Sequence, residues 1–115
     1  MTIKNFLTYN CGTLVVLCCN TDGVDYKVSI HLYNHTFSTS CSIGETNISH
    51  LLMKLKSNIQ LFYDKTVYII TDLFIYDKDT GDLINIIMDF FYKHEIECLV
   101  GTYDDFMEYI KKDDW

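Results

Sequence analysis

Residues 13–20, TLVVLCCN, decide the architecture because their apolar side chains would face both sides of a strand. The apolar run extends without interruption from Leu14 to Cys19. Since successive side chains of a strand point to opposite faces, such a run predicts a central strand that is covered on both sides. It is far too short to cross a membrane. We therefore expect a layered domain built around this segment.

Two alternating strands follow the central one. Asp22-Gly23 predicts a tight turn, and the next strand, Tyr26 to Tyr33, places Val28, Ile30 and Leu32 on one face. A third strand, Thr36 to Ile43, alternates in the same way. Because one face of each is polar, both are expected to be half-exposed strands of an antiparallel unit.

Helical and strand patterns alternate over the rest of the chain. Thr46 or Asn47 can cap a helix whose apolar face extends from Ile48 to Phe62. The remaining predicted elements are a strand from Thr66 to about Phe74, a loop at 77–81, a helix at 82–94, a strand at 97–101 and a helix after Thr102. The order β-β-β-α-β-α-β-α predicts one α/β (α+β) domain, residues 1–115, with a five-stranded mixed sheet and helices on its faces.

The charge of the chain favours a protein partner over nucleic acid. The formal net charge is −7, from sixteen acidic and nine basic residues, and all nine basic residues are lysine. Nucleic-acid-binding proteins usually carry a basic surface, and arginine supplies their forked contacts to phosphate and guanine. We therefore expect a basic protein partner and no direct binding of nucleic acid.

The cysteines indicate a reducing compartment. There are five: Cys11, Cys18, Cys19, Cys41 and Cys98. The number is odd, and Cys18 and Cys19 are neighbours on the central strand, where they point to opposite faces. Buried, reduced thiols are the expected state, and together with the absence of an apolar N-terminal stretch this predicts a cytoplasmic location without membrane association.

Acidic residues gather beside aromatic residues in the second half of the chain. The candidate partner-binding residues are Tyr76, Asp77, Asp79, Asp82, Tyr103, Asp104, Asp105, Asp113, Asp114 and Trp115. A solvated face is the alternative for any such run, and the spacing of Thr102 and Asp105 also fits a capping box. Aromatic rings bordered by carboxylates nevertheless suit a surface that engages a basic protein.

Four short motifs fall at corresponding points of one known fold. They are Thr21-Asp22-Gly23, Glu45-Thr46-Asn47, Ile70-Thr71-Asp72 and Asp104-Asp105. With the order of elements, they make the chain similar to the ribonuclease H-like fold. The resemblance covers most of the chain at the level of element order, while each motif is two or three residues long.

The resemblance implies a two-metal nuclease site. Its implied ligands are Asp22, Asp72 and Asp105 (or Asp104), holding Mg²⁺ or Mn²⁺ that would activate water against a phosphodiester. From the residues alone, Asp22 before Gly23 is first of all a hairpin-turn residue, whereas Asp72 can equally be a ligand or an acid that meets solvent or a helix N-terminus at a strand end. The family's first-helix glutamate would fall near His50 or Leu51, so its carboxylate set is incomplete here.

Two functions of different class follow from these observations. The first is a small acidic inhibitor, of the toxin-immunity or phage anti-defence type, that occludes a basic, nucleic-acid-processing partner and needs no cofactor. The alternative is a metal-dependent ribonuclease H-like nuclease that uses Asp22, Asp72 and Asp105. Incomplete ligands and the absence of arginine favour the first.

Overall fold

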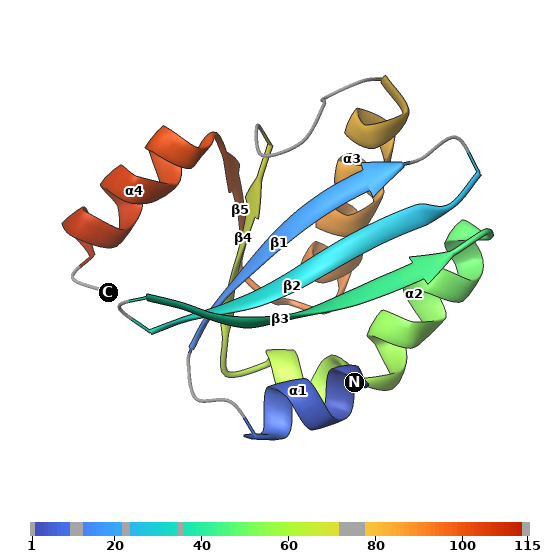
Figure 1. Ribbon diagram of the computed structural model, residues 1–115, viewed down its shortest axis with the longest axis horizontal. Helices are drawn as coiled ribbons and strands as arrows, with labels where there is room; N and C mark the ends of the chain where they lie inside the picture. The colour runs from blue at the N-terminus through green and yellow to red at the C-terminus, as the bar shows by residue number, and fades with distance from the viewer. Residues whose placement is uncertain (1, 10–12, 22–23, 35, 72–77, 114–115) are drawn as a thin grey trace.

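The structure is a computed structural model that describes residues 2–9, 13–21, 24–34, 36–71 and 78–113 (Figure 1). In chain order, the elements are α1 (Ile3–Tyr9), β1 (Leu14–Thr21), β2 (Tyr26–Asn34), β3 (Thr36–Glu45), α2 (Ile48–Ser57), the 3-10 turn η1 (Ile59–Phe62), β4 (Thr66–Ile70), α3 (Lys78–Lys93), β5 (Cys98–Gly101) and α4 (Tyr103–Lys112).

The five strands form one mixed sheet in the order β3-β2-β1-β4-β5. β2 runs antiparallel to both β1 and β3, whereas β1, β4 and β5 are parallel neighbours. The prediction of an α+β fold with a five-stranded mixed sheet is confirmed. Leu14 to Cys19 are all buried in the central strand, as the unbroken apolar run requires.

Each face of the sheet has its own hydrophobic core. Val15, Leu17 and Cys19 of β1 pack in the first core with apolar residues of α1, α2 and α3. Leu14 and Val16 point the other way, into a smaller second core with residues of β4 and α4. Since alternate side chains of β1 serve the two cores, α3 and α4 lie on opposite faces of the sheet (Figure 1).

Capping residues set two helix starts as their sequence predicts. Asn47 caps α2, because its side-chain oxygen accepts a hydrogen bond from the backbone N–H of Ser49 at 2.7 Å. Of the two predicted N-cap candidates, Thr46 and Asn47, the structure therefore has Asn47. Thr102 and Asp105 form the capping box of α4. Each satisfies a backbone N–H that the first helical turn would otherwise leave without a partner.

The apolar pattern from Ile48 to Phe62 does not form one continuous helix. α2 ends at Ser57, and η1 continues the chain from Ile59 to Phe62. The break lies at Asn58, whose side-chain amide donates to the Lys54 carbonyl oxygen at 2.8 Å while its backbone N–H bonds to carbonyls of the last turn. This closes the helix in the way that a C-cap does.

One predicted boundary was wrong, and one helix was not predicted. Residues 78–81, expected to belong to a loop, form the first turn of α3, where Thr80 and Gly81 are buried. The short helix α1 was not predicted, although Ile3, Phe6 and Leu7 are buried in the first core. β4 ends at Ile70, and the last residues of its predicted span, up to Phe74, lie largely outside the described residues.

The described cysteines are buried thiols. Cys18, Cys19, Cys41 and Cys98 are buried and free of disulfide bonds, and Cys11 lies outside the described residues. Within the described part of the chain, no helix combines the length and the apolar character that crossing a membrane requires.

Candidate functional site

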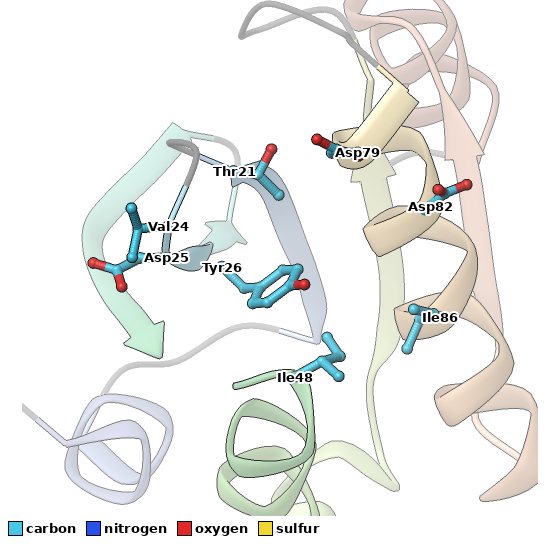
Figure 2. Close-up of a pocket in the computed structure, with 8 residues that line it drawn as sticks. All are labelled: Thr21, Val24, Asp25, Tyr26, Ile48, Asp79, Asp82 and Ile86. Carbon is cyan, nitrogen blue, oxygen red and sulfur yellow. The ribbon is translucent and has the colours of Figure 1, made fainter. Parts of the chain in front are cut away.

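A pocket of about 350 Å³ opens where β1 ends, between the start of β2, the start of α2 and the first turns of α3 (Figure 2). Its lining residues are Thr21, Val24, Asp25, Tyr26, Ile48, Asp79, Asp82 and Ile86. We call this site the acidic pocket. Four separate segments of the chain meet there, so the pocket exists only in the folded protein.

A hydroxyl pair fixes α3 against the end of β1. The Thr21 and Thr80 side-chain oxygens lie 3.3 Å apart, and Thr80 is 2% exposed in the first turn of α3. A buried hydroxyl requires a partner, so this contact holds the helix start beside the strand end. Asp79 therefore lies at the mouth of the pocket, and Figure 2 shows it pointing toward Thr21.

The walls of the acidic pocket are partly apolar. The ring of Tyr26 extends toward α3 above Ile48, and Ile86 lies on the opposite wall (Figure 2). Ile86 is 39% exposed and Val24 is 73% exposed. Exposed apolar residues beside a hollow offer contact surface for an aliphatic chain.

The polar part of the lining is acidic. Asp79 and Asp82 come from α3, and Asp25 comes from the segment before β2. No lysine or histidine lies among the eight lining residues that the structure describes. In Figure 2 the Asp79 carboxylate points toward Thr21, whereas the carboxylates of Asp25 and Asp82 point away from the space between Tyr26 and α3. Aspartates beside apolar walls are complementary to a lysine or arginine side chain, whose stem is aliphatic and whose end is cationic.

The structure divides the predicted partner-binding residues between two faces. Asp79 and Asp82 lie in the acidic pocket on the α3 side of the sheet. Tyr103, Asp104 and Asp105 belong to α4 on the other side, followed by its C-cap Asp113, and all four are exposed. The described residues of this set thus form two surfaces. Tyr76, Asp77, Asp114 and Trp115 lie outside the described residues.

Of the predicted metal ligands, the structure describes Asp105. Its side-chain Oδ2 accepts the backbone N–H of Thr102 at 3.0 Å, and its own N–H donates to the Thr102 hydroxyl at 3.2 Å. Asp104, the alternative ligand, is exposed on the same helical turn. Asp22 and Asp72 lie outside the described residues.

Asp105 also affects the neighbouring Tyr68. Burial is the main cause of the raised pKa of the Tyr68 phenol, and the negative charge of Asp105 and the proximity of Tyr109 raise that pKa further.

Among the residues that the structure describes, no group of three or more histidine, cysteine, aspartate or glutamate side chains is arranged to hold a metal ion. The contacts of Asp105 are those of a helix cap.

The buried thiols lack the properties of catalytic nucleophiles. Burial raises the pKa of Cys18 to about 11 and the pKa values of Cys19 and Cys98 to about 12. Reactive cysteines have depressed pKa values and open access, because the thiolate is the attacking species. These three thiols act as small apolar side chains of the interior.

Six of the eight lining residues were not predicted as site residues: Thr21, Val24, Asp25, Tyr26, Ile48 and Ile86. The available signal was Ile86, an apolar residue at the margin of the apolar arc of α3, which remains exposed. Tyr26 and Ile48 looked like ordinary positions at the start of an element. Only their convergence in the folded chain makes them a site.

No protein-family model, curated protein or solved structure matches this chain. The geometry of the site and the charge of the chain are therefore the features that bear on function.

Proposed function

We propose that this protein is a small acidic inhibitor, of the toxin-immunity or phage anti-defence type, that acts in the cytoplasm and occludes a basic, nucleic-acid-processing protein. The observation that carries the proposal is the acidic pocket. It combines three carboxylates, an aromatic ring and apolar walls, and its described lining contains no basic side chain.

The proposed mechanism is insertion of one basic side chain of the partner. Its aliphatic stem would lie on Ile48 and Ile86, and its cationic end would meet Asp79 and Asp82. Proteins that hold nucleic acid present lysine and arginine in their clefts, so the binding of such a side chain would exclude the phosphate backbone. The net charge of −7 would accelerate the encounter with a positively charged surface.

We further propose that the fold is of the ribonuclease H-like type. Support comes from the antiparallel unit β1–β2–β3, which is followed by parallel strands joined through helices. This is the arrangement of elements on which the resemblance depends.

A metal-dependent ribonuclease H-like nuclease is the second candidate. The observation in its favour is that β1 and β4 are parallel neighbours. Asp22 and Asp72 follow these two strands in the sequence, and parallel neighbours end at the same edge of a sheet. Two carboxylates that follow neighbouring parallel strands in the sequence would be a starting set for a divalent cation.

The inhibitor proposal is tested with the double variant Asp79→Asn/Asp82→Asn. Tagged wild type and variant are used as bait in lysate of the native host with the neighbouring genes expressed, and the captured basic protein is then titrated by calorimetry. Loss of two charge-assisted contacts should weaken binding by about two orders of magnitude. The matched control is Asp89→Asn/Glu97→Gln, which removes equal charge at exposed positions outside the pocket.

The results separate the two candidates. Equal affinity of the two double variants would refute the assignment of the acidic pocket, and capture of no basic nuclease at low salt would refute the inhibitor class. Melting with millimolar Mg²⁺ or Mn²⁺ tests the nuclease: a metal site raises the melting temperature by mass action, and Asp72→Asn should abolish that rise.

A further inference from the structure

The edge of the sheet at β3 is long and free of charge along most of its length. β3 is the terminal strand of the sheet, and within the described residues no strand pairs with its outer side. It has ten residues, and only the last, Glu45, is charged. The opposite edge strand, β5, has four residues.

Natural sheets usually protect such an edge. Lysine, proline, a bulge or a covering segment blocks pairing with another chain. β3 contains neither lysine nor proline, and the register shift in its pairing with β2 begins just beyond the His31–Ser40 pair, so residues 40–45 themselves are paired in regular register. Residues 40–45 thus retain the backbone geometry that accepts a further strand.

A groove runs along this half of the edge. It measures about 350 Å³ and is lined by Thr2, Ile3, Lys4, Cys41, Ser42, Ile43, Gly44, Lys54 and Asn58. Cys41 and Ile43 are buried beneath the helices, whereas Ser42 and Gly44 are exposed on the other face. Because four consecutive residues line it, with side chains on both faces, the groove borders the backbone edge of β3. We call it the edge groove.

The charge around the edge groove is positive, in contrast to the chain as a whole. The charged residues of α1, α2, β2 and β3 are Lys4, Lys27, Lys54, Lys56 and Glu45. Lys4 and Lys54 line the groove from two helices, and Lys54 also pairs with Glu45. A second copy of this chain paired symmetrically through β3 would bring the same lysines together, so charge disfavours that occupant.

We propose that the β3 edge binds an extended acidic peptide segment of a partner protein as a sixth strand. Main-chain hydrogen bonds to residues 40–45 supply the pairing, and a carboxylate side chain of the added strand enters the edge groove between Lys4 and Lys54. This surface shares no residue with the acidic pocket and is independent of the function proposed for it.

The test uses two fluorescein-labelled, end-capped peptides of nine residues, one alternating threonine with glutamate and the other alternating threonine with lysine. The alternation gives both peptides the same tendency to extend, so charge is the variable. Binding to the full chain is measured by anisotropy at low salt, and amide hydrogen exchange is recorded with and without peptide. We expect the glutamate peptide to bind at least tenfold more tightly and to slow exchange at residues 40–45.

The double variant Lys4→Gln/Lys54→Gln should weaken binding of the glutamate peptide by roughly tenfold, since two partly exposed ion pairs are lost. The matched control, Lys93→Gln/Lys111→Gln, changes exposed lysines on α3 and α4 and should bind as wild type does. Equal binding of the two peptides, exchange protection elsewhere than β3, or no binding at millimolar peptide would each overturn the proposal. So would a concentration-dependent dimer in sedimentation that the glutamate peptide does not dissociate.

Discussion

Replacing Phe106 tests how α4 is attached to the sheet. The Phe106 side chain is completely buried in the second core. Its ring meets Tyr33 at a centroid distance of 5.6 Å and Tyr68 at 5.2 Å, in both cases edge to face. Ile110 is the other buried residue of α4, and the partly buried Tyr109 also packs on Tyr68, at a ring-centroid distance of 5.4 Å.

The expected cost follows from these contacts. Phe106→Ala should lower the free energy of unfolding by about 3–5 kcal/mol, as a buried phenylalanine replaced by alanine usually does. Phe106→Leu retains most of the apolar volume but loses two edge-to-face ring contacts, each contributing about 0.5–1.5 kcal/mol, so about 1–3 kcal/mol is expected. Against a typical domain stability of about 5–15 kcal/mol, the alanine variant should be close to unfolding.

Urea unfolding followed by circular dichroism measures both values. The matched control is Phe90→Leu in α3, because Phe90 is 9% exposed in the first core and has an edge-to-face contact with Phe91 at 5.4 Å. Phe106→Leu should cost more than Phe90→Leu. If the two leucine variants are equally stable, or if Phe106→Ala costs less than about 1 kcal/mol, the assignment of α4 docking to this ring is wrong.

Two further predictions concern backbone packing and pH. Gly101→Ala should destabilise the fold by about 1–3 kcal/mol in a urea titration, because the added Cβ would collide with the Tyr68 hydroxyl and lie 2.9 Å from the Asp105 Cβ. In the control Gly44→Ala, the added Cβ would meet only the Lys27 side chain, at 3.8 Å. That variant should be nearly neutral in the same titration. Burial raises the pKa of Cys98 from 9.0 to about 12. As the pH rises, the thiol therefore loses its proton at a lower pH in the unfolded chain than in the folded chain. The stability that the buried thiol contributes is complete below pH 9 and is lost between pH 9 and 12. Between pH 8 and pH 10, the free energy of unfolding of wild type should therefore fall by about 1.4 kcal/mol more than that of Cys98→Val, as measured by urea unfolding. An equal pH dependence of the two proteins would contradict the buried-thiol assignment.

Local sequence signals were strong enough to predict the sheet. The unbroken apolar run from Leu14 to Cys19 has one low-energy placement, in a strand covered on both faces. The alternation of Val28, Ile30 and Leu32 fixes which face of β2 is buried. The Thr102–Asp105 capping box likewise depends on neighbouring residues. Such features need no knowledge of the rest of the fold.

Tertiary contacts decided the elements that were not predicted. α1 has seven residues, too few to be stable alone, and burial of Ile3, Phe6 and Leu7 stabilises it. The start of α3 contains Gly81, which resembles a loop residue in the sequence. Thr80 in this turn contacts Thr21, far away in the chain, and both Thr80 and Gly81 are buried, so the turn is packed against the end of β1.

Only part of the candidate site could be predicted from the sequence, because the rest of it also depends on tertiary contacts. Asp79 and Asp82 are close in the sequence and on neighbouring turns of α3, so their proximity could be predicted. Tyr26 and Ile48 join them through the packing of β2 and α2 against α3. The acids of α4 looked continuous with this cluster, but the alternation of β1 side chains places α3 and α4 on opposite faces.

The chain separates its charge along the sheet, and this separation gives each proposed surface its own partner. Residues 78–113 contain nine acidic residues against four lysines, whereas α1, α2, β2 and β3 together contain four lysines and one glutamate. If the two proposals hold, a basic protein would be steered toward α3 and an acidic strand toward β3. The two surfaces share no lining residue, so neither ligand should displace the other, and added salt should weaken both interactions because both depend on exposed charge. Competition between a basic partner and the glutamate peptide would place both on one surface and contradict this division.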